Sequence, residues 1–228
     1  RAARARGRVA FRRLIAVDRD PACQLIREVV DPAVLLEVAE WGEFFDRWLA
    51  EPRATAPDSS GPPDAIVPSP LMPHLMYEWL ERRARARWPG RSIARAPLAL
   101  PLGTPYEHVG KDGTSYVSFA DWLCPTHCVE PAICPVIDGP RTWEMSDAVT
   151  ALTARLARLS PAAGPALFHC RHQVFGVGMF TVPEVLACDR LVAAAGASGA
   201  QVDVVVGTVS ACHGALSVLR LGPEEGNG

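Results

Sequence analysis

The sequence lacks several features that would assign it at once to a broad class of protein. No apolar run approaches the ~20 residues that a membrane-spanning helix needs, and residues 1–13 lack the apolar core of a signal peptide. Acidic and basic residues number 25 and 23, so there is no excess of basic charge for nucleic acid. We therefore expect a cytoplasmic protein with no membrane span, and we do not expect nucleic acid among its partners.

Common catalytic and phosphate-binding motifs are also missing. The sequence has no Gly-x-Ser-x-Gly elbow, no Walker phosphate loop and no His-Glu-x-x-His pair. No two cysteines have the two-residue spacing of a zinc ribbon. Apolar residues make up 49% of the chain and charged residues 21%, which excludes a disordered protein and predicts a chain that folds around a core.

Cysteine is the residue type whose distribution is most informative. The chain has seven cysteines, and an odd number in a chain of this length does not suggest the disulfide framework of a small secreted domain. Cys23 and Cys188 are expected to be core thiols, because free cysteine is among the most buried residue types. Three others lie within eleven residues, from 124 to 134, and such clustering points to metal binding or redox chemistry.

Apolar periodicity predicts alternating strands and helices, and therefore an α/β fold. The predicted strands are residues 9–17, 64–68, 116–119, 166–170, 202–209 and 216–221. The predicted helices are residues 22–30, 32–41, 72–87, 146–159 and 183–195. Prolines interrupt residues 89–105, which places a boundary near residue 95. The sequence thus predicts an N-terminal domain of residues 1–95 and a C-terminal α/β domain of residues 96–228.

The first predicted strand ends in an acidic residue, Asp18, followed by Arg19-Asp20-Pro21. Residues 1–95 resemble a Rossmann-type NAD(P)-binding protein without its first strand and glycine loop, as found in dehydrogenases and Trk-type potassium-uptake regulators. The resemblance implies NAD or NADP as cofactor, with Asp18 binding the ribose hydroxyls. The chain begins at Arg1 without a methionine, and we expect the missing glycine loop upstream. The simpler alternative is that Asp18 only ends a strand and begins a turn.

The cysteine segment, Cys124-Pro-Thr-His-Cys128-Val-Glu-Pro-Ala-Ile-Cys134-Pro, has the composition of a metal-binding loop. Its prolines fix the backbone and favour turns over a helix. Thiolates prefer soft metals, so the segment predicts an iron–sulfur cluster or zinc held by Cys124, Cys128 and Cys134.

Two further Cys/His segments, His169-Cys-Arg-His172 and Cys212-His213, each follow a predicted strand, and a helix lies between them. A strand–helix–strand unit normally makes the strands parallel, so both segments would emerge at the same edge of the sheet. We therefore expect Cys212 as a further metal ligand, and His213, Cys212 and His169 as catalytic candidates. If strands 202–209 and 216–221 instead form a hairpin, the argument from a shared edge weakens.

Together these features predict an NAD(P)-linked redox protein with a Cys-ligated metal centre, which would be an oxidoreductase if it is an enzyme. One alternative is a non-enzymatic, NAD-sensing regulatory subunit of the potassium-uptake type with a structural zinc. Another is a Cys-dependent hydrolase or transferase without a metal. The expected partners are the nucleotide cofactor and a small-molecule ligand. The sequence names no substrate and leaves open whether the chain forms an oligomer.

Overall fold

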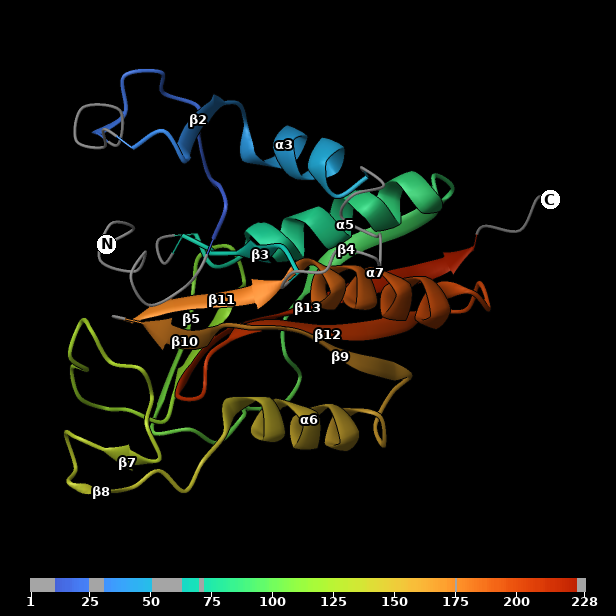
Figure 1. Cartoon of the computed structure of the whole chain (residues 1–228). Coiled ribbons are helices and arrows are strands. Elements are labelled where there is room, and N and C mark those ends of the chain that lie inside the picture. Colours follow the sequence, from blue (N-terminus) through green and yellow to red (C-terminus); the bar gives the residue numbers. More distant parts are fainter. Residues whose placement is uncertain (1–10, 25–30, 51–62, 70–71, 175, 225–228) are drawn as a thin grey trace. The chain divides into compact units, whose positions relative to one another are not determined.

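The chain divides into two compact units, Arg1–Gly61 and Pro62–Gly228. The computed structural model describes residues 11–24, 31–50, 63–69, 72–174 and 176–224 (Figure 1). The division does not fall near residue 95, because strand β4 (Arg91–Ala96) pairs with the C-terminal strand β13 (His213–Glu224). The prolines around β4 flank a strand of the larger unit rather than mark a linker.

The described part of the first unit contains two parallel strands and a helix. Strand β1 (Leu14–Asp18) pairs in parallel with β2 (Val34–Val38), and Asp18 lies opposite Val38. Helix α3 (Trp41–Trp48) follows. The predicted strand before Asp18 is confirmed, but the predicted helix over 32–41 is wrong because its apolar residues pair with β1. Most of the predicted helix over 22–30, residues 25–30, lies outside the described residues.

A six-stranded sheet forms the centre of the second unit. Its strands follow the order β5-β6-β13-β12-β9, and β4 also pairs with β13. The other sheet members are β5 (Tyr106–Val109), β6 (Ser115–Ser118), β9 (Ala162–His169) and β12 (Val202–Val209). Because β12 is parallel to β9 and antiparallel to β13, the predicted parallel pair and the alternative hairpin are both present.

Two smaller groups of strands extend the second unit. One consists of β3 (Ala65–Ile66), β10 (Arg171–Val174) and β11 (Val177–Thr181). The other is the short pair β7 (Ile133–Cys134) and β8 (Gly139–Pro140), which lies within and just after the cysteine segment. These additions matter because both groups contribute residues near one edge of the central sheet.

Helices cover the two faces of the central sheet (Figure 1). Helix α6 (Met145–Leu156) lies on one face, and α5 (Leu75–Arg87) and α7 (Val182–Gly196) lie on the other. Helix α7 begins with a capping box, in which Thr181 and Glu184 satisfy each other's backbone N–H groups. The sequence predicted all three helices.

The core explains why most residues of β12 are β-branched. Val205 and Val209 pack with Met145, Val149 and other residues of α6. Alternate residues of a strand point to opposite faces, and Val204 and Val206 are also at most 2% exposed. The strand is therefore buried on both faces, which accounts for its many β-branched residues. The mixture of helices and strands is that of an α/β protein, and no helix in the described residues is long and apolar enough to cross a membrane.

Candidate functional site

One edge of the central sheet brings together segments that are far apart in the sequence. His169 ends β9 and lies opposite Val209, the last residue of the parallel strand β12. The turn between β12 and β13 follows at once and is closed by the backbone N–H of Ser210, which donates to the carbonyl of His213 at 2.8 Å. The Cys212-His213 turn therefore lies at the edge where the carboxyl ends of both parallel strands meet.

A pocket of about 90 Å³ lies at this edge and is lined by residues from several elements. Its lining includes the side chains with metal-binding chemistry: Cys124, Cys128, Cys134, Cys212, His172 and His213. The volume is far below the ~300–1,000 Å³ of pockets that hold drug-sized ligands. It suits an ion or a molecule of a few atoms, and it cannot enclose a dinucleotide.

Glu130 joins the cysteine segment to the turn between β12 and β13. Its carboxylate accepts the hydroxyl of Ser210 at 2.6 Å and the backbone N–H groups of Ala211 and Cys212 at 3.0 and 3.3 Å. The side chain is only 8% exposed, and the backbone adopts a positive φ of 51°. This carboxylate therefore fixes the position of Cys212 relative to the other three cysteines.

The hairpin of β10 and β11 forms a second wall. Nδ1 of His172 donates to the carbonyl oxygen of Cys128 at 3.1 Å. Gly176 has a φ of +67°, and a Cβ there would lie 2.4 Å from the carbonyl oxygen of Thr126. The cysteine segment therefore rests on a turn that has no room for a side chain.

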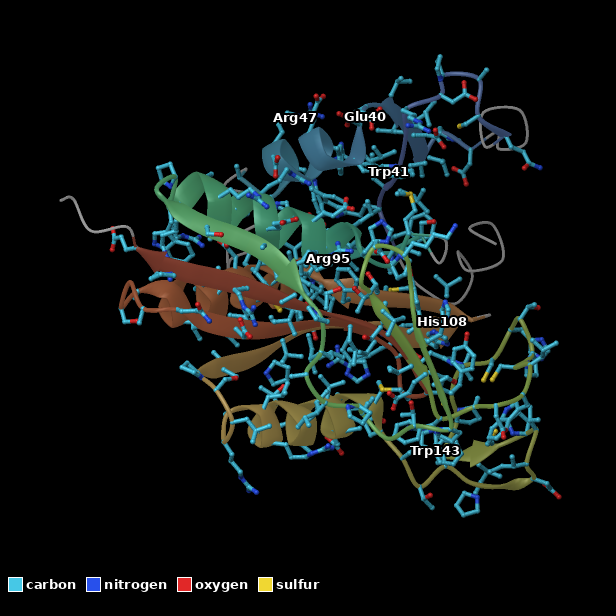
Figure 2. The ribbon with its side chains drawn as sticks, turned by 180° about the vertical axis from the view of Figure 1, so that it is seen from behind. Glu40, Trp41, Arg47, Arg95, His108 and Trp143 are labelled. Atoms are coloured by element: carbon cyan, nitrogen blue, oxygen red, sulfur yellow. The ribbon has the colours of Figure 1, made fainter. Side chains whose placement is uncertain are left out.

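Hydrogen-bond donors from the protein are directed at two of the sulfurs. The indole N–H of Trp143 donates to Sγ of Cys212 at 3.3 Å, and Figure 2 shows Trp143 between α6 and the β7–β8 segment. The backbone N–H of Glu130 donates to Sγ of Cys128, also at 3.3 Å. Such donors stabilise a thiolate much more than a neutral thiol, because hydrogen bonds to charged acceptors are the stronger ones.

Without a bound ion, the pocket disfavours the thiolate form of its cysteines. Burial raises the pKa of Cys124, and the neighbouring Cys128 and Cys134 raise it further. Burial likewise raises the pKa of Cys212 to about 11. Sulfurs that influence one another in this way require a compensating positive charge to ionise together.

His213 faces the cysteine segment. Its Nε2 lies 3.8 Å from Sγ of Cys124, and its Nδ1 lies 2.9 Å from the hydroxyl oxygen of Ser118 on β6. Desolvation lowers the pKa of His213, although the residue keeps one exposed side. The imidazole is therefore within reach both of a sulfur and of solvent.

Other candidates lie elsewhere. His169 does not line the pocket, and its Nε2 faces Oε1 of Glu144 at 3.5 Å. Cys170 and Cys188 are buried, and burial raises the pKa of each to about 12, as for a core thiol. Cys23 is only partly buried. Oδ1 of Asp18 accepts the backbone N–H of Asp20 at 2.9 Å, which is the local turn that the simpler alternative predicts.

The pocket side chains are near one another, but their donor atoms do not yet surround a common point. Among the residues that the structure describes, no three His, Cys, Asp or Glu side chains are already arranged to hold a metal ion. An ion would therefore have to draw its ligands together as it binds. Sequence reasoning missed Glu130 and Trp143. The only signal for Glu130 was an acidic residue between two cysteines, and Trp143 gave none.

A comparison with known protein families matches most of the second unit. A family model described as "AF_1314_C: Uncharacterized protein, C-terminal domain" matches residues 76–222. These residues include every residue that lines the pocket. Neither the curated proteins nor the solved structures contain a match to the chain.

Proposed function

Because the chain belongs to the AF_1314_C family, whose matched residues contain the whole pocket, we propose that this domain binds a metal on cysteine thiolates. One observation carries the proposal. Four cysteines line a single small pocket: Cys124, Cys128 and Cys134 from one segment, and Cys212 from a turn almost eighty residues further along the chain. A thiolate-bound metal supplies the positive charge that these sulfurs lack. Either zinc or an iron–sulfur cluster has the required preference for sulfur.

Two side chains beside the cysteines would support the metal rather than bind it. Glu130 would hold Cys212 in place, and the N–H donors of Trp143 and of the Glu130 backbone would stabilise ligating sulfurs. Hydrogen bonds to ligand sulfurs are a main means by which a protein tunes such a centre. An iron–sulfur cluster at this position would exchange single electrons, whereas zinc would fix the cysteine segment without redox chemistry.

The metal-free alternative, a Cys-dependent hydrolase or transferase, has less support. A nucleophilic cysteine must be largely a thiolate near neutral pH, which requires a lowered pKa. The pKa of Cys124 is raised and that of Cys212 is raised to about 11. Without an ion, these sulfurs would be poor nucleophiles.

The metal proposal is tested on the full chain purified without oxygen, by elemental analysis and absorption spectroscopy. We expect stoichiometric zinc, or iron with sulfide and visible charge-transfer absorption. Cys124→Ser, Cys128→Ser, Cys134→Ser and Cys212→Ser should each lower the metal content. Cys23→Ser is the matched control, because Cys23 does not line the pocket. A wild-type chain that stays metal-free, or four variants with wild-type metal content, would overturn the proposal.

The first unit carries the proposed link to NAD(P). Two parallel strands with Asp18 at the carboxyl end of β1 are the arrangement in which an acid binds ribose in dinucleotide folds. A complete NAD(P)-linked redox protein would pair this unit with an iron–sulfur centre. The regulatory alternative, NAD sensing with a structural zinc, uses the same two sites without turnover.

Dinucleotide binding is measured by titrating the full chain with NADH and NADPH and following their fluorescence. Asp18→Ala should weaken binding. Asp20→Ala is the control, because Oδ1 of Asp20 also accepts a backbone N–H two residues ahead, that of Ala22 at 2.8 Å. If neither dinucleotide binds, the NAD(P) half of the proposal fails and the metal half stands.

A further inference from the structure

The distance between Cys124 and His213 fits two ligands of one tetrahedral ion. Zinc–sulfur bonds of about 2.3 Å and zinc–nitrogen bonds of about 2.0–2.1 Å place the two donor atoms roughly 3.6 Å apart at a tetrahedral angle. The observed distance from Sγ of Cys124 to Nε2 of His213 is 3.8 Å. This pair therefore needs only a small adjustment to share an ion.

The hydrogen bonds of Ser118 assign the tautomer of His213. The Ser118 hydroxyl accepts the backbone N–H of Ala120 at 2.9 Å and donates its single proton to the carbonyl of Ala120 at 2.7 Å. It can then only accept from Nδ1 of His213, which lies 2.9 Å away. With the proton on Nδ1, Nε2 carries a free lone pair, and this is the atom that faces Cys124.

The backbone keeps Ser118 and His213 in this arrangement. They lie opposite each other in the antiparallel pair of β6 and β13. The next backbone N–H, that of Phe119, donates to the carbonyl of Cys212 at 2.9 Å. Metal-bound histidines typically donate their second ring N–H to a fixed protein group, which orients the ring. Ser118 occupies that role here, and the exposed side of His213 gives an ion a way in.

The competing explanation is a simple hydrogen bond, in which the Cys124 thiol donates to Nε2. The surroundings favour the ion. Cys128, Cys134 and Cys212 line the same pocket, and backbone or indole N–H groups are directed at two of these sulfurs. An isolated thiol–imidazole contact requires none of these groups.

From this geometry we infer that His213 is a metal ligand through Nε2, beside Cys124, and that Ser118 is its positioning residue. The inference rests on the proposed function and deepens it, because it selects the metal. A tetrahedral zinc site takes four ligands, so His213 takes the place of one of the four pocket cysteines, and three thiolates with one imidazole form a Cys3His zinc set. Iron–sulfur clusters are held by four cysteines, or by two histidines on one iron in the Rieske type. The site is thus a zinc-type centre, and His213 is a ligand rather than an acid–base catalyst.

The test uses the metal-free full chain titrated with Co²⁺, whose visible spectrum reports sulfur and nitrogen ligation, and then with Zn²⁺ in competition. The wild type should give the spectrum of a tetrahedral sulfur–nitrogen site. His213→Ala should lose that spectrum and weaken Zn²⁺ binding by at least the roughly 10–100-fold that removing a supporting group costs. Ser118→Ala should weaken Zn²⁺ binding roughly 10–100-fold while retaining an altered sulfur–nitrogen spectrum.

Two further variants distinguish the loss of a metal ligand from a general loss of folding. His127→Ala is the matched control, because His127 lies next to Cys128 but does not line the pocket, and it should behave as the wild type. His213→Cys should restore tight binding with the spectrum of a four-thiolate site.

Each failure has a distinct signature. If the wild type binds metal and His213→Ala keeps its affinity and spectrum, the assignment of His213 is wrong and the proposed function stands. A bound iron–sulfur cluster that persists in His213→Ala would likewise overturn the zinc-type assignment. If the wild type binds no metal at all, the proposed function itself fails.

Discussion

At the scale of single residues, Glu130 shows how a side chain outside the metal-binding set can decide whether a site exists. Its carboxylate is almost fully buried, yet no arginine or lysine pairs with it among the described residues. Its hydrogen-bond donors are the hydroxyl and N–H groups of Ser210, Ala211 and Cys212, and Nδ1 of His172 lies 4.0 Å from its Oε2. Hydrogen bonds to a charged acceptor are worth about 1.5–3 kcal/mol each. The carboxylate therefore offsets much of its own desolvation by fixing one short turn.

Replacing Glu130 by glutamine tests this role. Glu130→Gln removes the charge and turns an N–H group toward donors, so we expect a loss of about 1–3 kcal/mol in the free energy of unfolding. Metal affinity should fall roughly 10–100-fold. Denaturant unfolding of the metal-free chain and a Zn²⁺ titration measure the two effects.

Glu107→Gln is the control for that prediction. Glu107 also accepts two backbone N–H groups, those of Gly103 and Thr104, but it does so at the surface and outside the pocket. It should leave metal affinity unchanged. Equal metal affinity in Glu130→Gln and the wild type would show that Glu130 supports only the fold.

Gly176 gives a second prediction at this scale. Gly176→Ala introduces a Cβ that would lie 2.4 Å from the carbonyl oxygen of Thr126, so the backbone of residues 124–128 must shift. Metal affinity should fall, in addition to a cost of about 1–2 kcal/mol for placing a side chain at positive φ. A Zn²⁺ titration and denaturant unfolding separate the two effects.

Gly103 is the control for this prediction, because a side chain there meets the cost of a positive φ without a steric clash. It has a φ of +93°, and nothing lies within 4 Å of a Cβ built there. Gly103→Ala should therefore lose stability without losing metal affinity. If both glycine variants bind metal as tightly as the wild type, the cysteine segment does not depend on the turn at Gly176.

At this scale, cysteine spacing and strand order could predict which thiols lie near one another, while their role as metal ligands stays a prediction. Cys124, Cys128, Cys134 and Cys212 could be singled out from spacing and strand order, and all four line the pocket. Glu130 could not, because nothing in the sequence shows which backbone groups a carboxylate will meet. His169 was grouped with Cys212 by strand order, but its side chain faces Glu144. Strand order places a backbone at an edge and does not decide where the side chain points.

At the scale of elements, two helices on the same face of the sheet are joined by an ion pair. Asp189 on α7 is 7% exposed and accepts from Arg83 and Arg87 on α5 at 3.0–3.1 Å. Arg83 is half-exposed, so part of the arrangement is accessible to water. We therefore expect the contribution of this ion pair to the free energy of unfolding to lie between that of a surface salt bridge and that of a buried one.

Asp189→Ala should lower the free energy of unfolding by about 2–3 kcal/mol, because it leaves two arginines without their shared partner. Denaturant unfolding measures this loss. Glu81→Ala is the control, because it removes an exposed pair with Arg85 within α5 and should cost less than about 0.5 kcal/mol. Metal content should stay at the wild-type level in both variants. A loss below 1 kcal/mol in Asp189→Ala would show that packing alone joins the helices.

Elements were predictable wherever the pattern of apolar residues fits only one secondary structure. The valine-rich run of β12 fits only a strand, and the long amphipathic spacing of α6 fits only a helix. The run Val34-Leu-Leu-Glu-Val38 fits a helix as well as a strand, and only its pairing with β1 determines that it forms a strand. Strand β4 was missed because prolines flank it and because its partner, β13, lies at the other end of the unit. Non-local pairing cannot be read from a local window.

At the scale of the whole molecule, the proposed metal site and the proposed dinucleotide site belong to different units. All proposed metal ligands lie in Pro62–Gly228, whereas Asp18 lies in Arg1–Gly61. The sequence predicted two parts but placed the division near residue 95, because a proline-rich stretch signals a break and does not reveal a sheet that continues across it. The family match, over residues 76–222, lies wholly within the second unit.

This separation predicts where each ligand protects the backbone from hydrogen exchange. A ligand that binds only the native state stabilises it by about 2.7 kcal/mol when its free concentration is 100 times its Kd. Zn²⁺ should therefore slow exchange around Ser118, in residues 124–134 and in the turn at Cys212-His213. It should leave β1 and β2 unchanged, since no ligand lies there.

A dinucleotide should produce the opposite pattern, with protection in β1 and β2 and none at the pocket. Mass-spectrometric hydrogen exchange on the full chain, with each ligand alone, measures both patterns. Protection by Zn²⁺ in β1 and β2 rather than at residues 124–134 would contradict the placement of the metal. Protection by a dinucleotide at the pocket would contradict the volume argument, because a space of about 90 Å³ cannot enclose it. A chain that shows each pattern with its own ligand has two independent sites, and the family domain then supplies the metal centre alone.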